Sequence, residues 1–274
     1  MTESDTTPAA YQTPKGNGDP SWRAKGGYAL PGPTLASIRS LEAAGLREAS
    51  NSGQGPRRTI SLMGATGTGK TTLTRALQHQ FTTYVEHHED NPELDRLMAG
   101  DPSFNAFESQ RWFLARIEDF VNSSGKAQLV VIDQDPVAVT HVYGRLFFDA
   151  GAMDPADYCR LLAHGLAVQR LISRTRSRAI AYLTASPEAL RGRTAERSPK
   201  RAPDLDWHVS LEKRFADLAR HLPLAITLDT GMLTISEATD TLTRLCRARQ
   251  TKTAAGSTIG FCAGDRGAGS DLVS

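Results

Sequence analysis

A glycine-rich segment near the start of the chain constrains its fold more than any other feature. It reads Gly64-Ala65-Thr66-Gly67-Thr68-Gly69-Lys70-Thr71. This segment matches G-x-x-x-x-G-K-[ST], and it stands between a predicted strand at 59–63 and a predicted helix at 70–80. Backbone amides in such a loop curl around phosphate oxygens at a helix N-terminus, where the helix dipole favours negative charge. The pattern predicts that Lys70 pairs with the β- and γ-phosphates of ATP or GTP, that Thr71 ligates Mg²⁺, and that the site extends to Thr72.

The rest of the chain alternates short apolar runs with amphipathic stretches. The predicted strands are 59–63, 83–86, 128–133, 179–183 and 225–228. The predicted helices are 70–80, 92–99, 104–122, 137–150, 155–173, 187–197, 207–221 and 236–247. Short apolar strands separated by helices predict an α/β fold, a five-stranded parallel sheet with helices on both faces. Ligands of such sheets bind beyond the carboxyl ends of the strands.

Composition changes divide the chain into four parts. Residues 1–33 are rich in Pro, Gly and polar residues and predict a disordered N-terminal tail. Residues 34–56 predict a short helix with Thr34 as its N-cap, followed by a linker. Residues 57–248 form the predicted P-loop domain, and residues 249–274 predict a disordered C-terminal tail.

Charge and cysteine content exclude several classes of protein. The 32 Lys and Arg residues nearly balance the 30 Asp and Glu residues, which argues against a general nucleic-acid binder. No apolar run is long enough for a membrane span, and the first twenty residues lack the apolar core of an export signal. Three cysteines at unrelated spacings predict reduced thiols, so we expect a cytoplasmic protein.

Carboxylates follow two of the predicted strands. Asp133 closes the apolar strand QLVVID, where a group that holds Mg²⁺ is expected, and Asp135 is either a second magnesium partner or the N-cap of the next helix. Glu86 closes the strand before it, where a carboxylate could take the proton of a hydroxyl that attacks a γ-phosphate. Taken alone, Glu86 would more often be a solvated surface charge.

Several segments, in order, resemble the motifs of deoxynucleoside kinases, of the bacterial deoxyadenosine/deoxyguanosine kinase type. These segments are 86–94 (E-x-x-x-x-N-P-x-L), 110–114 (Q-x-x-F-L), 132–135, 143–158 (F-A-[RK]...G-x-M...[DE]-Y) and 182–197. The resemblance implies a P-loop nucleoside-kinase-like fold in which Glu86 is the general base and Gln110 reads the base edge of the acceptor. It also implies a homodimer, since members of the family are often dimers.

The segment after the fourth strand is similar to the family's S-P-E turn and R-x-x-x-R lid. Arg193 and Arg197 are four residues apart, so they lie on one face of a helix and can reach the same phosphoryl group. Two arginines there would neutralise charge that spreads over the phosphoryl oxygens in a loose transition state.

The acceptor region departs from the family pattern. Gln134 stands where the acidic-R-S motif has Arg, Asp135 stands where it has Ser, and Val139 stands where many members have Asp. A polar site rejects ligands that lack its hydrogen-bond partners, so these changes predict an altered acceptor, with Gln134 among the residues that bind it.

Together these features predict a kinase that transfers the γ-phosphoryl of ATP or GTP to a hydroxyl of a nucleoside or nucleoside-like acceptor. The predicted catalytic residues are Glu86, Lys70, Arg193 and Arg197, and the predicted metal ligands are Thr71 and Asp133. Two alternatives stay open. One is a P-loop kinase for a nucleotide, a sugar or a modified base, and the other is a nucleotide-binding regulatory protein without turnover.

Overall fold

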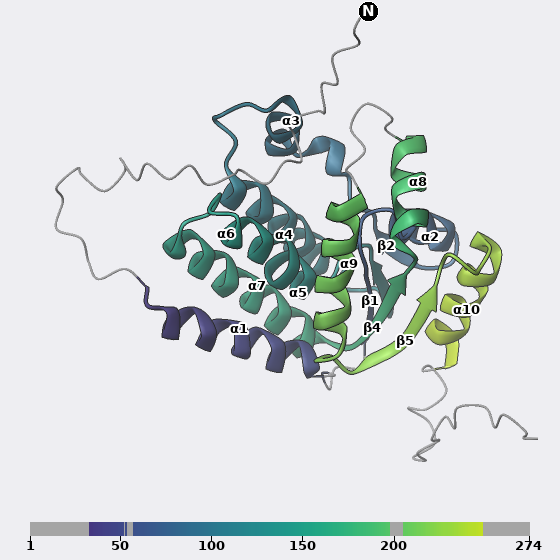
Figure 1. Ribbon diagram of the computed structural model, residues 1–274. Helices are drawn as coiled ribbons and strands as arrows, with labels where there is room; N and C mark the ends of the chain where they lie inside the picture. Colours follow the sequence, from purple (N-terminus) through teal and green to yellow (C-terminus); the bar gives the residue numbers. More distant parts are fainter. Residues whose placement is uncertain (1–32, 52, 54–56, 198–204, 249–274) are drawn as a thin grey trace, which may run out of the picture.

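The computed structural model describes residues 33–51, 53, 57–197 and 205–248 (Figure 1). At its centre lies a sheet of five strands in the order β2-β3-β1-β4-β5, with every neighbouring pair parallel. The strands are β1 (Arg57–Met63), β2 (Thr82–Tyr84), β3 (Leu129–Ile132), β4 (Arg176–Thr184) and β5 (Leu224–Asp229). The predicted α/β fold with a parallel five-stranded sheet is therefore confirmed.

Helices cover both faces of this sheet. In chain order, the helical elements of the described residues are α1 (Leu35–Ser50), α2 (Lys70–Leu77), η3 (His88–Asp90), α3 (Pro92–Ala99), α4 (Ala106–Ser123), α5 (Pro136–Ala138), η4 (Val139–Gly144), α6 (Arg145–Asp149), α7 (Pro155–Thr175), α8 (Pro187–Arg197), α9 (Leu205–Ala219) and α10 (Ile235–Ala248). Helices α2 and α10 pack on one face, where Leu73, Leu77 and Leu242 are buried. Helices α4, α5, α7 and α9 pack on the other face (Figure 1).

Helix α1 lies along α7 (Figure 1). Thr34 caps it, because its side chain accepts a hydrogen bond from the Ser37 N–H at 3.2 Å, as the sequence predicts. Glu42 on α1 accepts hydrogen bonds from Arg145 at 2.9 Å and from the Tyr158 hydroxyl at 2.9 Å. The helix is thus fixed to the body of the molecule by polar contacts as well as by apolar packing.

The predicted helix 137–150 is wrong in one respect, because it is not a continuous α-helix. A π-helical segment, η4, separates α5 from α6. The Thr140 hydroxyl donates to the Pro136 and Val137 carbonyl oxygens, both at 3.2 Å, so it competes for the backbone acceptors of this turn. Such π-bulges occur frequently at functional sites.

None of the helices in the described part of the chain is both long enough and apolar enough to cross a bilayer. The predicted disordered tails, residues 1–33 and 249–274, lie outside the described residues except for Pro33, so the predicted domain boundaries stay predictions.

Candidate active site

The phosphate loop has the geometry that its sequence predicts. Gly67 and Gly69 adopt the left-handed backbone region, with φ of +91° and +86°, which suits glycine. Gly69 is the N-cap of α2, so Lys70 and Thr71 open that helix. The Lys70 ammonium donates to the carbonyl oxygens of Gly64 at 2.8 Å and Ala65 at 3.1 Å. It therefore lies against the first residues of the loop.

Neighbouring elements hold the loop tightly. A Cβ at Gly64 would come within 2.3 Å of the Leu183 carbonyl oxygen at the end of β4. A Cβ at Gly67 would lie 3.0 Å from the Leu190 carbonyl oxygen on α8. The approach of the Leu183 carbonyl oxygen therefore requires glycine at position 64. The loop is held between the end of β4 and α8.

Asp133 follows β3 and is fully buried beside the loop. Its Oδ2 accepts a hydrogen bond from the Glu86 N–H at 3.1 Å, whereas its buried Oδ1 has no hydrogen-bond partner. Burial raises the pKa of Asp133, and the Lys70 ammonium and the Thr71 hydroxyl oppose that rise. A buried carboxylate oxygen and a nearby hydroxyl are oxygen donors of the kind that Mg²⁺ prefers, so Thr71 and Asp133 fit the predicted metal site.

This site would use few protein ligands. Within the described residues, no group of three or more His, Cys, Asp and Glu side chains could hold a metal ion. Mg²⁺ is typically bound by one or two carboxylates together with substrate phosphates, which agrees with a site built from Thr71, Asp133 and a nucleotide.

Glu86 lies two residues beyond β2, and its half-buried side chain is on the same edge of the sheet as the loop. Its backbone N–H donates to the Asp133 carboxylate, so the main chain at Glu86 is joined to Asp133. The pKa of the Tyr143 phenol is raised by burial and then by the negative charges of Glu86 and Asp133. Glu86 is therefore within electrostatic reach of the residues around the loop.

The two predicted acceptor-binding amides are both buried. The Nε2 of Gln110, on α4, donates to the Ser109 hydroxyl at 3.5 Å. The Oε1 of Gln134 has no hydrogen-bond partner. Asp135 is the N-cap of α5, since its Oδ1 accepts from the Val137 N–H at 2.8 Å, and it forms a buried ion pair with Arg178. The N-cap interpretation of Asp135 is confirmed, and the Oδ1 that caps the helix is occupied by protein donors.

The structure places Arg193 of α8 against the phosphate loop. It donates to the Gly67 carbonyl oxygen at 3.3 Å, to the Thr230 hydroxyl at 3.1 Å and to the Thr230 carbonyl oxygen at 2.6 Å. The side chain of Arg197 lies outside the described residues, as does the segment 198–204. The role of Arg197 stays a prediction.

The interpretation of the sequence gave no role in the site to two residues at this edge of the sheet. Thr230 follows β5 and contacts Arg193, and the Tyr143 hydroxyl lies 3.4 Å from the Thr66 hydroxyl. The rule that ligands bind beyond the carboxyl ends of parallel strands could have located Thr230. Tyr143 comes from the π-helix, which the sequence does not reveal.

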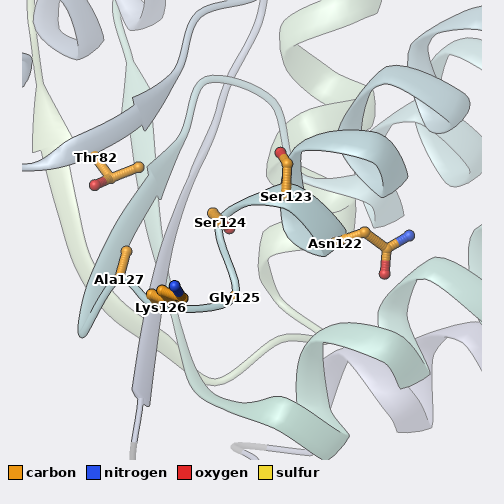
Figure 2. A pocket seen from close by; sticks show the side chains of 7 residues that line it. All are labelled: Thr82, Asn122, Ser123, Ser124, Gly125, Lys126 and Ala127. Carbon is orange, nitrogen blue, oxygen red and sulfur yellow. The ribbon is translucent and has the colours of Figure 1, made fainter.

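A separate hollow of about 610 Å³ lies at the opposite edge of the sheet, where β2 and β3 begin (Figure 2). It is lined by Thr82 and by residues 122–127, among them Lys126. None of the predicted site residues lines it. The site described above rests instead on the loop, Asp133, Glu86 and Arg193.

Comparisons with solved structures agree with the fold. Three structures of deoxyadenosine kinase from M. mycoides, with bound dCMP and dCDP, dCTP or dATP, match with TM-scores of 0.56, 0.55 and 0.55. Their sequence identities are 14%, 16% and 15%, and the matches cover 69% of this chain and 98–100% of each kinase. The fold and the phosphate loop thus define a P-loop protein with the architecture of deoxynucleoside kinases.

A family model described as "AAA domain" matches residues 59–231. This match spans more than half of the chain, so the protein belongs to the AAA domain family. No curated protein sequence matches the chain.

Proposed function

We propose that this protein transfers the γ-phosphoryl group of ATP or GTP to a hydroxyl group of a nucleoside or nucleoside-like acceptor. One observation supports the proposal most: the Glu86 N–H donates to Asp133, which lies beside Lys70 and Thr71. The residue whose carboxylate could act as a base is thereby joined through its main chain to Asp133, the group that fits Mg²⁺, beside the loop that would hold the triphosphate.

The proposed transfer forms one bond and breaks one bond at the γ-phosphorus, and it moves one proton to the enzyme. The acceptor oxygen forms a bond to the γ-phosphorus while the bond from that phosphorus to the β,γ-bridging oxygen breaks, and the nucleoside diphosphate leaves. The Glu86 carboxylate accepts the acceptor's hydroxyl proton. The loop amides and Lys70 hold the phosphate oxygens in line, so the protein contributes mainly position and charge.

Mg²⁺, when bound, would neutralise charge on the phosphate oxygens. Thr71 and Asp133 are the residues that would hold it. The raised pKa of Asp133 is consistent with this role, because a buried carboxylate without a full set of donors favours a nearby cation.

Arg193 would act on the transferring group from the α8 side. In the structure its guanidinium donates to a carbonyl oxygen of the phosphate loop, so this cation already lies beside the segment that would hold the phosphates. Arg197 would lie on the same face of α8, and the two cations would together stabilise the transition state.

The altered acceptor region favours a second candidate. Gln134 presents a buried neutral amide with an unpaired oxygen where the resemblance predicts arginine. A kinase for another acceptor, such as a nucleotide, a sugar or a modified base, would explain that change. A nucleotide-binding regulator without turnover is the remaining alternative.

We also propose that the protein is a homodimer and that it is located in the cytoplasm. Light scattering would test the homodimer, and cell fractionation would test the location.

A screen for phosphoryl transfer separates these functions. The purified protein is incubated with Mg–ATP or Mg–GTP and a panel of nucleosides, nucleotides and sugars, and products are identified by mass spectrometry. The proposal predicts a phosphorylated nucleoside or nucleoside analogue, which the Lys70→Ala variant does not form. Phosphorylation of only another class of acceptor would favour the second candidate. Nucleotide binding without any product would favour the regulator.

A further inference from the structure

The hydroxyl of Tyr143, on η4, reaches the phosphate loop. Its oxygen lies 3.4 Å from the Thr66 hydroxyl, although the two residues are 77 positions apart in the sequence. The charges of Glu86 and Asp133 both act on the phenol. Tyr143 is therefore close to the phosphate loop, to the proposed base and to the proposed magnesium ligand.

The contact with Thr66 places Tyr143 at one particular end of the phosphate loop. The Lys70 ammonium, which in this motif pairs with the β- and γ-phosphates, lies on the carbonyl oxygens of Gly64 and Ala65. Thr66 is the next residue of the loop. The Tyr143 hydroxyl thus lies at the γ-phosphate end of the loop.

Packing fixes the phenol in this position. The Tyr143 ring makes an edge-to-face contact with Phe215 of α9, with centroids 5.7 Å apart and planes at 73°. Its neighbour Gly144 lies so close to α7 that a Cβ would come within 2.5 Å of Leu161 Cδ2. A donor that is already held in place costs little entropy when a ligand arrives.

The hydroxyl is also in the right chemical state to donate. A tyrosine is protonated at neutral pH, and burial together with the charges of Glu86 and Asp133 raises the pKa of Tyr143 further, although hydrogen bonds to Thr66 and Gln134 oppose that rise. The adjacent Gln134 is uncharged where the resemblance predicts an arginine. The neutral Tyr143 hydroxyl therefore stands beside a position where the resemblance predicts a cation and this chain has none.

We propose that the Tyr143 hydroxyl donates a hydrogen bond to a γ-phosphate oxygen of the bound nucleoside triphosphate, and that this bond distinguishes triphosphate from diphosphate. The proposal rests on nucleotide binding by the loop, which is part of the proposed function, but it does not depend on the identity of the acceptor. In the proposed transfer, the same bond stabilises charge on the phosphoryl oxygens, which makes Tyr143 a catalytic residue.

Calorimetric titration with a non-hydrolysable ATP analogue and with ADP, each with Mg²⁺, tests this inference without any acceptor. Tyr143→Phe removes only the hydroxyl. We expect this variant to lose about tenfold or more of the preference for triphosphate over diphosphate, with ADP affinity unchanged, because a hydrogen bond to a charged oxygen is lost. Tyr84→Phe is the matched control. The charges of Glu86 and Asp133 add to the effect of burial in raising the pKa of Tyr84 as well, but the Tyr84 ring packs on Phe120. We expect this control to keep the parent's preference.

Two results would overturn the inference. One is a Tyr143→Phe variant that keeps the parent's preference for triphosphate. The other is an equal loss in Tyr84→Phe, which would indicate a general effect on the site. Absence of transfer to every acceptor would refute the proposed kinase reaction but would leave this binding result intact, so the two failures can be told apart.

Discussion

The buried ion pair between Arg178 and Asp135 gives the sharpest prediction about stability. The side chains are 1% and 0% exposed, and the Arg178 guanidinium donates to Asp135 Oδ1 and, at 3.3 Å, to Gln169 Oε1. The same Asp135 oxygen caps α5 through the Val137 N–H. Removing one partner would leave an uncompensated charge in the core directly behind the loop that carries Asp133 and Gln134.

The expected magnitude follows from this burial. Arg178→Met leaves the Asp135 carboxylate without its cation, and breaking a buried pair in this way costs about 3–5 kcal/mol. Asp135→Asn leaves a buried guanidinium and should cost a similar amount, while the side-chain oxygen that caps α5 is retained. The double variant removes both charges, so it should cost less than the sum of the single variants, by about 2 kcal/mol or more.

Urea unfolding followed by circular dichroism at neutral pH measures these free energies. Arg170→Met is the control, because Arg170 is 53% exposed and its nearest distance to Glu48 is 3.9 Å. An exposed pair of this kind contributes about 1 kcal/mol or less. If Arg178→Met were as mild as Arg170→Met, or if the two single variants were additive, the interpretation of Arg178 and Asp135 as a coupled buried pair would be wrong.

Three further predictions concern other parts of the site and of the fold. Gly64→Ala should lower stability by about 1–3 kcal/mol and weaken nucleotide binding, because its Cβ would overlap the Leu183 carbonyl oxygen; calorimetry and thermal unfolding would detect both effects. Arg193→Gln should lower kcat by about 10²–10³-fold, whereas the exposed Arg191→Gln should change kcat little, and equal values for the two variants would remove Arg193 from the mechanism. Burial lowers the pKa of His141, so the unfolded state binds more protons below the imidazole's ordinary pKa of about 6.5, and stability should fall there by up to about 1.4 kcal/mol per pH unit. Unfolding of the parent and of His141→Gln between about pH 7.5 and 5.5 tests this, and parallel curves would contradict it.

The elements around the phosphate loop were predictable because local signals determine them. Apolar runs and the glycine pattern located all five strands and α2, and Thr34 marked the start of α1. Asp133 and Glu86 were predictable for a related reason, since each follows a strand whose carboxyl end faces the loop. The hydrogen bond that joins them could not be predicted, because it depends on how β2 and β3 are aligned in space.

Other features depend on partners that are distant in the sequence. The predicted fourth strand began at Ala179, but β4 begins at Arg176. Arg176 is buried because it donates to the carbonyl oxygens of Ala127 at 2.9 Å and Ser124 at 2.6 Å, which lie about fifty residues away. A strand pattern based on hydropathy treats such a residue as exposed, so the boundary was missed. The π-helix escaped prediction because the apolar periodicity of 137–150 is that of an ordinary helix and does not show the changed hydrogen-bond register of η4.

The most direct test of the central claim is phosphoryl transfer by Glu86→Gln. Glu89→Gln is the matched control, since Glu89 is three residues away, 54% exposed, and paired with His87 and His88. With an accepted nucleoside and Mg–ATP, we expect Glu86→Gln to lower kcat by about 10²–10⁴-fold, with ATP affinity nearly unchanged, and Glu89→Gln to keep the parent's rate. Equal rates for Glu86→Gln and the parent would contradict the assignment of Glu86 as the base, and with it the proposed mechanism.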